Sequence, residues 1–500
     1  MSALVSNLAL GFSVALSPHN IGLAFVGCLV GTLIGVLPGV GPIATITMLL
    51  PITFGLPPVG ALIMLAGIYY GAQYGGSTTA ILVNIPGEVT SVVTTLDGHQ
   101  MAKQGRAGVA LGISALGSFF AGCVATLLIA ALAVPLTRVA LLFGPAEYTA
   151  LMTTGLVFAV VLARGSILKS IAMVLVGLLL STLGTDLETG VERMTFGYAP
   201  LSDGVDFAVL AMGLFGFAEV MRNLDVHQVR DTVRAAIGRL LPSARDMRQA
   251  SGPVLRGTAV GAVLGILPGN GAVLGPFASY ALEKRLARDP SRFGRGAIEG
   301  VAGPESANNA GAQTSFIPLL TLGIPPNAVM ALMVGAMTIH GIVPGPLVMT
   351  RNAPLFWGLI VSMWIGNLML LVINLPLIGI WVRLLKVPYR LMFPTIVLFC
   401  CIGIYSVNNS ASDVVFSACF ALLGYMGSKL GFESAPLLLG YVLGRLLEEN
   451  LRRALALARG DLSIFLVRPV SAALLLAGAV VLALAVLPNV RARRQEVFTE

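Results

Sequence analysis

Charged residues are scarce in this 500-residue sequence: Asp, Glu, Lys and Arg make up 11% of it, whereas a soluble domain has about 25%. Hydrophobic residues make up 56%. This balance argues against a cytosolic enzyme, a secreted disulfide scaffold and a disordered regulator. It is typical of an integral membrane protein, and at about 20 apolar residues plus a connection per span the chain could hold about ten to fifteen membrane segments.

The residues that build catalytic and metal sites are few and scattered. Four histidines form no group with acids or cysteines that resembles a metal site or a catalytic triad. No glycine-rich stretch is followed by Gly-Lys-Ser/Thr, so we expect no ATPase, no enzyme and no bound cofactor. The cysteines lack the paired spacing of zinc, haem or redox motifs, and we expect small buried hydrophobes at Cys28, Cys123, Cys400, Cys401 and Cys419.

The net charge of +8 does not indicate nucleic acid. The basic residues lie in short connections between apolar runs, which the positive-inside rule explains better. No basic region precedes the first apolar run, so we expect no cleavable signal peptide.

An internal repeat divides the chain. Residues 27–41 (GCLVGTLIGVLPGVG) and 257–271 (GTAVGAVLGILPGNG) share glycines and a Leu-Pro-Gly motif at an offset of 230. The Gly-Ala-Gln of residues 71–73 recurs 240 residues later, and the Ile-Pro of residues 85–86 recurs 239 residues later. Glycines four residues apart fall near one helix face, where a neighbouring helix backbone can approach closely. One interpretation is that these glycines form only such a packing ladder, a row of close helix contacts.

Each copy predicts a helical hairpin that enters the membrane and returns to the same side. Proline and glycine end a helix at Leu-Pro-Gly-X-Gly. The stretches Leu255–Leu267 and Ala272–Glu283 would then be about 20 and 18 Å long, shorter than a hydrocarbon core of about 30 Å. Basic residues flank both ends of the second copy, but none precedes Lys103. The positive-inside rule and an odd number of crossings between the copies both predict opposite orientations.

A polar membrane segment follows each hairpin, GIYYGAQYGGSTTAILVNIPGE in the first half and PESANNAGAQTSFIPLLTLGIPPN in the second. We expect each segment to unwind around its small hydroxyl and amide side chains. Freed helix N-termini suit an anion, and freed carbonyl groups suit Na⁺. Alternatively, these side chains only join neighbouring helices.

Hairpin tips and unwound segments together supply the candidate substrate- and ion-binding residues. We expect no metal site apart from Na⁺ at the hairpin tips. Glu305 is the most suggestive acid, whereas Glu219 is expected near the cytoplasmic end of a crossing. The candidates are Pro38, Gly39, Gly41, Ser77, Thr78, Thr79, Asn84, Pro268, Gly269, Asn270, Gly271, Asn308, Asn309, Thr314 and Ser315.

We therefore predict an all-α polytopic membrane protein. Its two inverted-topology repeats each carry a re-entrant helical hairpin and a broken transmembrane helix, in an elevator-like ion-transporter architecture. The predicted divisions are a first repeat at 1–136 (hairpin about 20–56, broken helix about 59–96, helix 107–134), connecting helices and a basic cytoplasmic loop at 137–254, a second repeat at 255–350 (hairpin 255–283, broken helix about 299–323), and C-terminal transmembrane helices at 351–500.

Over nearly its whole length the sequence resembles the large membrane subunit of tripartite tricarboxylate transporters, the TctA-type permeases. The resemblance is carried by GVLPGVGPIATITMLLPITFGLPPVGALIMLAGIYYGAQYGGSTTAILVNIPGE, by the DGHQMAKQGRAG loop, and by LPGNGA followed by GPESANNA. The family motifs fall on Leu37 to Pro42, Gly71 to Pro86, Leu267 to Gly271 and Pro304 to Ala310.

The resemblance implies a multi-pass permease of the bacterial inner membrane. It also implies a small membrane subunit and a periplasmic solute-binding protein as partners, with a carboxylate such as citrate imported by symport with Na⁺ or H⁺. A stand-alone ion-coupled carboxylate carrier and a passive anion channel remain alternatives. A membrane enzyme would need a nucleophile, base or metal cluster, which we do not find in the sequence.

Overall fold

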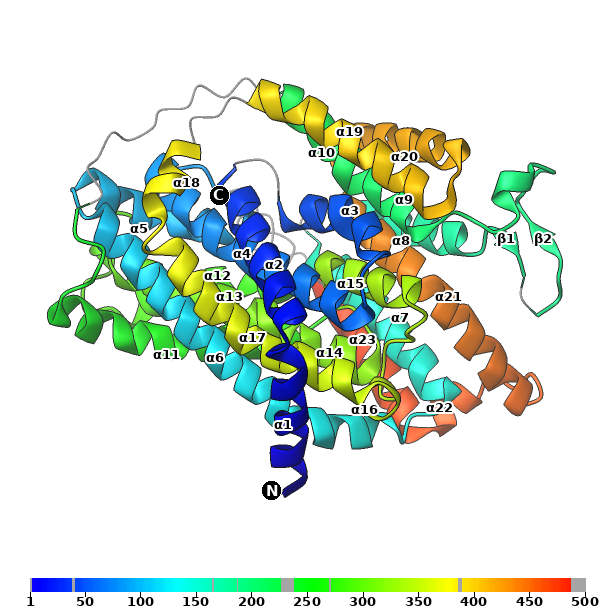
Figure 1. Ribbon diagram of the computed structural model, residues 1–500. Coiled ribbons are helices and arrows are strands. Elements are labelled where there is room, and N and C mark those ends of the chain that lie inside the picture. The colour runs from blue at the N-terminus through cyan, green and yellow to red at the C-terminus, as the bar shows by residue number, and fades with distance from the viewer. Residues whose placement is uncertain are drawn as a thin grey trace.

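The structure, a computed structural model, describes residues 2–37, 41–163, 166–186, 188–225, 238–268, 271–384 and 389–486. Helices make up nearly all the regular structure of these residues (Figure 1). Two short strands, β1 (Gly184–Thr185) and β2 (Glu192–Arg193), pair antiparallel in a hairpin that projects at one edge. The predicted all-α class is confirmed.

Within the described residues, five helices are long and apolar enough to cross a membrane: α2 (Pro18–Val36), α6 (Ala107–Ala140), α7 (Pro145–Leu162), α17 (Ala353–Asn374) and α20 (Ala411–Lys429). Shorter apolar helical segments cover Leu4–Ala15, Pro42–Thr53, Ile167–Ser181, Ala328–Ile339 and Pro469–Ala485. Large hydrophobic side chains such as Leu127, Leu179 and Val372 are exposed on these helices, as suits contact with lipid. The chain is a multi-pass membrane protein.

The N-terminal part is a series of helices started by prolines. Pro18, Pro42 and Pro58 occupy the first turns of α2, α3 and α4, where the missing N–H removes no helical hydrogen bond. Besides α2 and α6, its elements are α1 (Ser2–Ala15), α3 (Pro42–Thr53), α4 (Pro58–Val83), η1 (Val89–Ser91) and α5 (Val92–Lys103).

The middle of the chain joins the two parts of the repeat. Its η3 segment is a π-helix. It packs so closely on α20 that a Cβ added at Gly213 would lie 2.6 Å from the Ser417 carbonyl oxygen. Besides α7, the elements are α8 (Ile167–Ser181), the two strands, η2 (Ala199–Leu201), α9 (Phe207–Ala211), η3 (Met212–Phe217) and α10 (Ala218–Asp225).

The second copy of the repeat begins with a helix longer than expected. The predicted hairpin start at residue 255 lies inside α11, which begins at Ala244 because Ser243 caps it. Its 23 residues extend about 34 Å, longer than the predicted stretch from Leu255, but α11 is not one of the five helices that are long and apolar enough to cross a membrane. The elements are α11 (Ala244–Ile266), α12 (Gly271–Leu286), η4 (Pro290–Arg292), α13 (Glu299–Thr314), α14 (Phe316–Leu322) and α15 (Ala328–Ile339).

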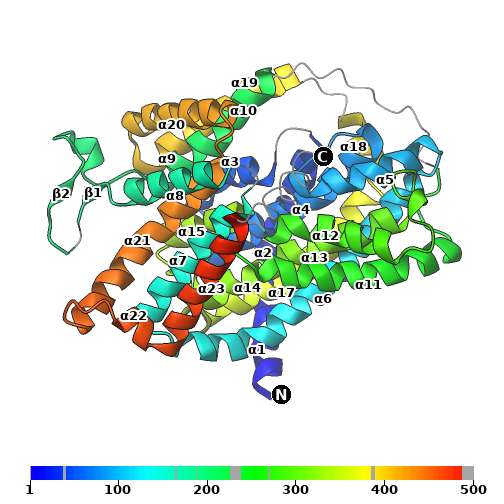
Figure 2. The same cartoon turned by 180° about the vertical axis from the view of Figure 1, so that it is seen from behind.

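The C-terminal helices have two sets of neighbours: α17 packs against α1, α2, α4 and α6, whereas α19 to α23 pack mainly against α7, α8, α10 and η3. Figures 1 and 2 both show α10, α19 and α20 running together, with α21 descending beside α7 and α8. Besides α17 and α20, the elements are α16 (Val348–Arg351), α18 (Ile378–Leu384), α19 (Tyr389–Asn408), α21 (Ser434–Leu457), α22 (Ile464–Val467) and α23 (Pro469–Val486).

The repeated glycines are packing ladders. Each lets two helix backbones come so close that an added Cβ would lie only 2.1–2.4 Å from a carbonyl oxygen of the partner helix. On α2, the pairs of glycine and carbonyl are Gly27 with Met64, Gly31 with Ile68 and Gly35 with Ala72 of α4. On α11, they are Gly257 with Gly303, Gly261 with Ala307 and Gly265 with Gly311 of α13. The carbonyl positions 64, 68 and 72 lie 239 residues before 303, 307 and 311, so this offset relates α4 to α13.

The two helix pairs at the Leu-Pro-Gly motifs are arranged differently. α12 folds back along α11 at close range. A Cβ added at Gly271 would lie 2.0 Å from the Leu264 carbonyl oxygen, and one added at Gly275 would lie 3.5 Å from Gly261 Cα. α12 also packs along α13, whereas α3 packs against α15, α19 and η3 as well as α4. Helices with corresponding places in the sequence therefore have different neighbours.

The predicted unwinding is found at fewer residues than expected. α4 continues through Gly71–Thr79, where a break was expected, whereas the second segment is interrupted at Ser315, within the predicted 299–323, after α13 has continued through Pro304–Asn309. Small hydroxyls bond to carbonyl oxygens four residues earlier, as Thr78 does to Tyr74 and Thr314 to Ala310, so the helices accommodate them without unwinding. The chain instead leaves the helix at Asn84, and in the second half at Ser315 and again at Gly323.

The cysteine prediction holds in part. Cys28 and Cys400 are buried, and Cys123 and Cys401 are partly buried. Cys419 is exposed on α20, so the expectation of a buried hydrophobe there is wrong.

Candidate substrate and ion site

A cavity of about 770 Å³ lies where the two parts of the repeat meet α10, α20 and α21. Its lining includes residues of α3 and α4 from the first half and of α12, α13 and α15 from the second. The volume lies in the range of sites for small-molecule ligands, about 300–1,000 Å³.

Besides α5, which continues directly from η1 and has Val92 in the lining, four helices of 12 or more residues have first-turn residues at the cavity. The first backbone N–H groups of a helix have no partner within it, and this end carries a partial positive charge. Such ends together favour an anion. The first-turn residues are Pro42, Ile43 and Ala44 of α3, Ala272, Val273 and Leu274 of α12, Ala328 and Val329 of α15, and Ser434 and Ala435 of α21.

One wall of the cavity is a polar cluster around Glu88. Asn308 Nδ2 donates to Glu88 Oε1 at 3.2 Å, joining α13 to the connection between α4 and α5. Thr90 Oγ1 lies 2.5 Å from Glu88 Oε1 and 3.0 Å from Gln73 Oε1. Asn308, Gln73 and Thr90 are all buried, with 1%, 2% and 6% exposure.

Glu88 and Asn327 hold corresponding places in the two halves, 239 residues apart. Both are extended residues at the start of a helix: Glu88 has φ −146° and ψ 170°, and Asn327 has φ −152° and ψ 173°. Ser91 Oγ accepts from the Glu88 N–H, and Asn327 Oδ1 accepts from the Met330 N–H. Both residues line the cavity.

Other charged groups lie elsewhere on the lining. Glu219 and Arg222 of α10 form an ion pair, and Glu433 precedes α21. Glu219 was expected only near a helix end, and the structure places it at the cavity in the first turn of α10. The lining therefore carries more acidic than basic side chains, which an anionic substrate must overcome.

Behind this wall, Glu305 is fully buried in α13. Its carboxylate accepts hydrogen bonds from the hydroxyls of Ser77 (α4), Thr94 (α5) and Ser114 (α6), the last at 3.0 Å. Glu305 does not line the cavity, and its contacts join four helices in the way that interhelical polar bonds do.

The predicted site residues fall into separate places. Pro38, Gly39, Gly269 and Asn270 lie outside the described residues. Gly41 and Asn308 line the cavity. Asn84 is exposed at the end of α4, and Pro268 and Gly271 lie at the turn between α11 and α12.

The remaining predicted residues bond within or between helices. Thr78 bonds to Tyr74 of its own helix and also lines a separate small pocket of about 10 Å³. Thr314 likewise bonds within α13. Bonds between helices join Ser77 to Glu305, Thr79 to the Val36 carbonyl, Asn309 to Ser118, and Ser315 to the Gly265 carbonyl.

Sequence reasoning missed five polar lining residues within the repeat, Tyr69, Gln73, Glu88, Thr90 and Asn327, and four outside it, Arg222, Ser428, Glu433 and Ser434. The repeat held a signal for two of them, because Glu88 follows Ile-Pro by two residues and Asn327 does the same. Among the described residues, no three His, Cys, Asp or Glu side chains gather as a metal ion would need.

The fold and the cavity define a multi-pass helical membrane protein with an internal cavity at which helix N-termini gather. Residues 21–439 match the tripartite tricarboxylate transporter TctA family. The chain therefore belongs to this family of transporters, and the resemblance predicted from its motifs is confirmed. The family's transporters are tripartite, which implies that the chain works with other subunits.

Two relatives come from Agrobacterium vitis. The "Uncharacterized 52.8 kDa protein in TAR-I ttuC' 3'region" is 57% identical over 500 residues, covering 100% of both chains. The "Uncharacterized protein in TAR-II ttuC' 3'region" is 59% identical over 240 residues, which is 48% of this chain and 99% of the relative. No solved structure shows significant similarity to the chain.

Proposed function

We propose that the chain is the permease subunit of a binding-protein-dependent secondary transporter. It imports tricarboxylates or related carboxylates by cation symport across the bacterial inner membrane. Its partners are a small membrane subunit and a periplasmic solute-binding protein, as membership of a tripartite family suggests. The cavity between the two parts of the repeat is its substrate site.

The observation that carries this proposal is the gathering of four helix N-termini at one cavity. Their unpaired N–H groups would bind carboxylate oxygens without a fixed positive charge inside the membrane. A substrate with two or three carboxylates could contact several of these helix ends at once. In secondary transporters, sites of this kind lie between repeats at the ends of interrupted helices.

The different packing of α3 and α12 supports alternating access. α12 folds back along α11 and α13, and α3 has other neighbours. If the two copies are inverted in the membrane, exchange of these arrangements would open the cavity first to one side and then to the other. An elevator-like movement of the repeat unit against the remaining helices is our preferred form of this exchange.

Uptake into proteoliposomes tests the function. The vesicles would contain the chain and its small membrane subunit, with and without the binding protein and with an imposed Na⁺ or H⁺ gradient. We expect a labelled carboxylate such as citrate to accumulate only with both the binding protein and a cation gradient. Flux that is indifferent to both would support a passive channel instead.

Cysteine labelling tests the sidedness. Ile43 of α3 and Val273 of α12 are 230 residues apart, and both line the cavity. In a chain whose native cysteines are replaced, single cysteines at these two positions should react from opposite faces of the membrane, each in a different transport state. Labelling of both from one face in every state would contradict the inverted arrangement.

A further inference from the structure

We infer that Glu88, Gln73, Thr90 and Asn308 form a sodium-ion site in the wall of the cavity. The inference rests on the proposed function and assigns its coupling ion and the residues that bind it. It places the ion at the connection between α4 and α5 and at α13, rather than at the hairpin tips.

The hydroxyl of Thr90 cannot satisfy both oxygens beside it. Thr90 Oγ1 lies 2.5 Å from Glu88 Oε1 and 3.0 Å from Gln73 Oε1, and a threonine hydroxyl carries a single proton. The 2.5 Å contact is short enough to hold that proton between Thr90 and Glu88, which leaves the 3.0 Å contact with Gln73 Oε1 without one. Turning the Gln73 amide over would supply an N–H there, whereas in the orientation described a cation bound to the Thr90 and Gln73 oxygens would stabilise the contact.

Asn308 adds a second unsatisfied oxygen. Its side chain is 1% exposed, it lines the cavity, and its Oδ1 has no hydrogen-bond partner. In this orientation Nδ2, not Oδ1, faces Glu88 Oε1. A half-turn of the amide exchanges the two atoms, gives up the hydrogen bond to Glu88 and places the oxygen 3.2 Å from Glu88 Oε1, where a bound cation would have to replace that bond. Two oxygens bound at right angles to one cation at about 2.4 Å are about 3.4 Å apart, so this spacing suits a shared ion.

The charge of the cluster selects a monovalent ion. Glu88 supplies one negative charge, and Gln73, Thr90 and Asn308 supply neutral oxygens, whereas Ca²⁺ sites usually gather several carboxylates. The other charged groups of the lining are Glu433 and the Glu219–Arg222 pair. On α13, Glu305 lies one turn before Asn308, and its carboxylate accepts from hydroxyls of α4, α5 and α6.

This site would couple the cation to the substrate through charge. An ionised Glu88 in the cavity wall repels a carboxylate substrate, and the repulsion is strong where water is partly excluded. A bound Na⁺ cancels this charge, so that Glu433 is then the acid of the lining outside the Glu219–Arg222 pair, and the helix N-termini act on the substrate with less opposition. Sodium therefore raises the affinity for the substrate, and the substrate raises the affinity for sodium by the same factor.

Sodium binding to the purified full-length chain tests the inference. The thermal unfolding midpoint would be measured while NaCl replaces choline chloride at constant ionic strength and pH. We expect Na⁺ to raise the midpoint in the wild type. Thr90→Val should raise the Na⁺ concentration for half the effect about tenfold, and high Na⁺ should restore the full shift. Glu88→Gln should abolish the sodium response.

Matched controls lie outside the cavity. Thr338→Val removes a hydroxyl bonded only within α15, and Glu449→Gln removes an exposed acid of α21. Both should keep the wild-type response to Na⁺. A wild-type midpoint that does not respond to Na⁺, or a Glu88→Gln variant that responds as the wild type does, would overturn the inference. A response to pH alone would also overturn it and assign a proton to Glu88.

Citrate binding and uptake separate this inference from the proposed function. We expect Glu88→Gln to bind citrate equally well with and without Na⁺, but to lose accumulation driven by a sodium gradient. If the wild type accumulates citrate without any dependence on Na⁺, the function stands and the sodium site fails. If Na⁺ binds at Glu88 but the complete transporter moves no carboxylate, the site stands and the function fails.

Discussion

Asn84 and Gly323 end their helices in the same left-handed backbone conformation, with φ of 60° and 75°, and they lie 239 residues apart. Ile-Pro follows each of them, and an extended residue, Glu88 or Asn327, then begins the next segment at the cavity. This shared turn places corresponding residues of the two halves on one lining.

Substitutions at the two copies of the left-handed turn should lower the free energy of unfolding by different amounts. Asn84 is exposed, so Asn84→Ala should lower it by about 1 kcal/mol, because alanine tolerates the left-handed conformation less well than asparagine. Asn84→Gly should leave it unchanged, because glycine adopts this conformation readily. Gly323 is buried, and a Cβ there would also lie 2.7 Å from the Pro344 carbonyl oxygen, so Gly323→Ala should cost more. Thermal unfolding in detergent checks the order; equal losses for the two alanine variants would contradict it.

The glycine ladders predict severe effects of a single methyl group. Gly31→Ala would place Cβ 2.3 Å from the Ile68 carbonyl oxygen, and Gly261→Ala would place it 2.1 Å from that of Ala307. Both backbones must then separate, and we expect each variant to lose several kcal/mol or fail to fold. Folded yield and unfolding midpoint are the measurements.

Gly22→Ala is the matched control for these variants. It lies on α2 like Gly31, but a Cβ there meets nothing within 4 Å. Alanine favours a helix over glycine by about 1 kcal/mol, so this variant should be as stable as the wild type or more so. If Gly31→Ala were as stable as the wild type too, the prediction that close backbone packing forbids a Cβ at Gly31 would be wrong.

Local signals in the sequence account for much of the helical structure. The glycine spacing of residues 27–35 and 257–265 predicted the helix faces that pack. Prolines at 18, 42, 58 and 145 each begin a helix, a signal that the predictions did not use. The break expected within α4 was wrong, because small hydroxyls such as that of Thr78 bond back to their own helix, and composition alone does not show this.

The cavity was harder to predict because distant helices form it. α10 and the α20–α21 connection contribute Arg222 and Glu433, and no sequence pattern links them to the repeat. The pairing of Glu88 with Asn327 could have been predicted, because each follows an Ile-Pro by two residues and the two Ile-Pro pairs lie 239 residues apart. The packing of α4 and α13 follows this offset, whereas Gly-Ala-Gln recurs at 240.

Asn327→Asp tests the anion preference of the cavity. The change is nearly isosteric, and aspartate can still accept from the Met330 N–H at the start of α15. It adds a negative charge beside the helix N-termini and also loses the amide bond to Ser315 Oγ. We expect citrate affinity to fall at least about tenfold, with a smaller effect on stability.

Asn450→Asp serves as its control, because this residue of α21 bonds only to the Leu446 carbonyl and does not line the cavity. Its citrate binding should match the wild type. Unchanged citrate binding by Asn327→Asp would remove this cavity from consideration as the carboxylate site.

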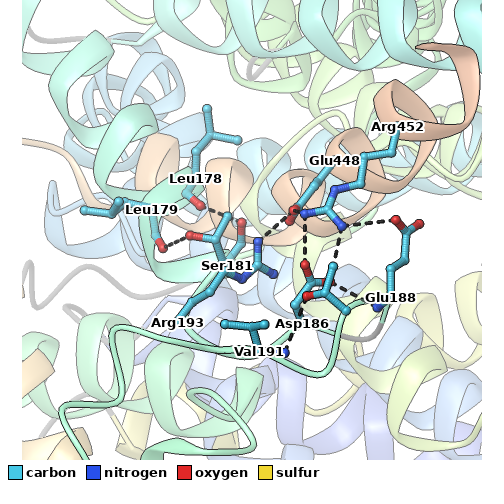
Figure 3. Close-up of polar contacts among 11 residues, drawn as sticks. Leu178, Leu179, Ser181, Asp186, Glu188, Val191, Arg193, Glu448 and Arg452 are labelled. Atoms are coloured by element: carbon cyan, nitrogen blue, oxygen red, sulfur yellow. Dashed lines mark hydrogen bonds and ion pairs between the residues drawn. The ribbon is translucent and has the colours of Figure 1, made fainter. Parts of the chain in front are cut away.

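The β1–β2 hairpin offers a test that depends on pH. Arg452 of α21 contacts both carboxylate oxygens of Asp186, at 3.2 and 3.0 Å, and also reaches Glu188 and Glu448 (Figure 3). The Glu188 backbone N–H and the Arg452 side chain lower the pKa of Asp186 to about 2. Because the folded pKa is below the unfolded value of about 3.9, the stabilisation is present above pH 4 and is lost as the pH falls toward 2.

Pepsin cleavage between residues 184 and 204 measures this stabilisation. Asp186→Asn lacks the charge, so at pH 4 we expect it to be cut faster than the wild type, whereas at pH 2 the two should be cut at similar rates. Comparing the two chains at each pH removes the pH dependence of pepsin itself. Arg452→Gln should be cut at least as fast as Asp186→Asn at pH 4, because it removes the pairs with both Asp186 and Glu188, whereas the Arg193–Glu448 pair still joins the hairpin to α21 in each variant. A constant ratio of cleavage rates across this range would show that the ion pair does not hold the hairpin.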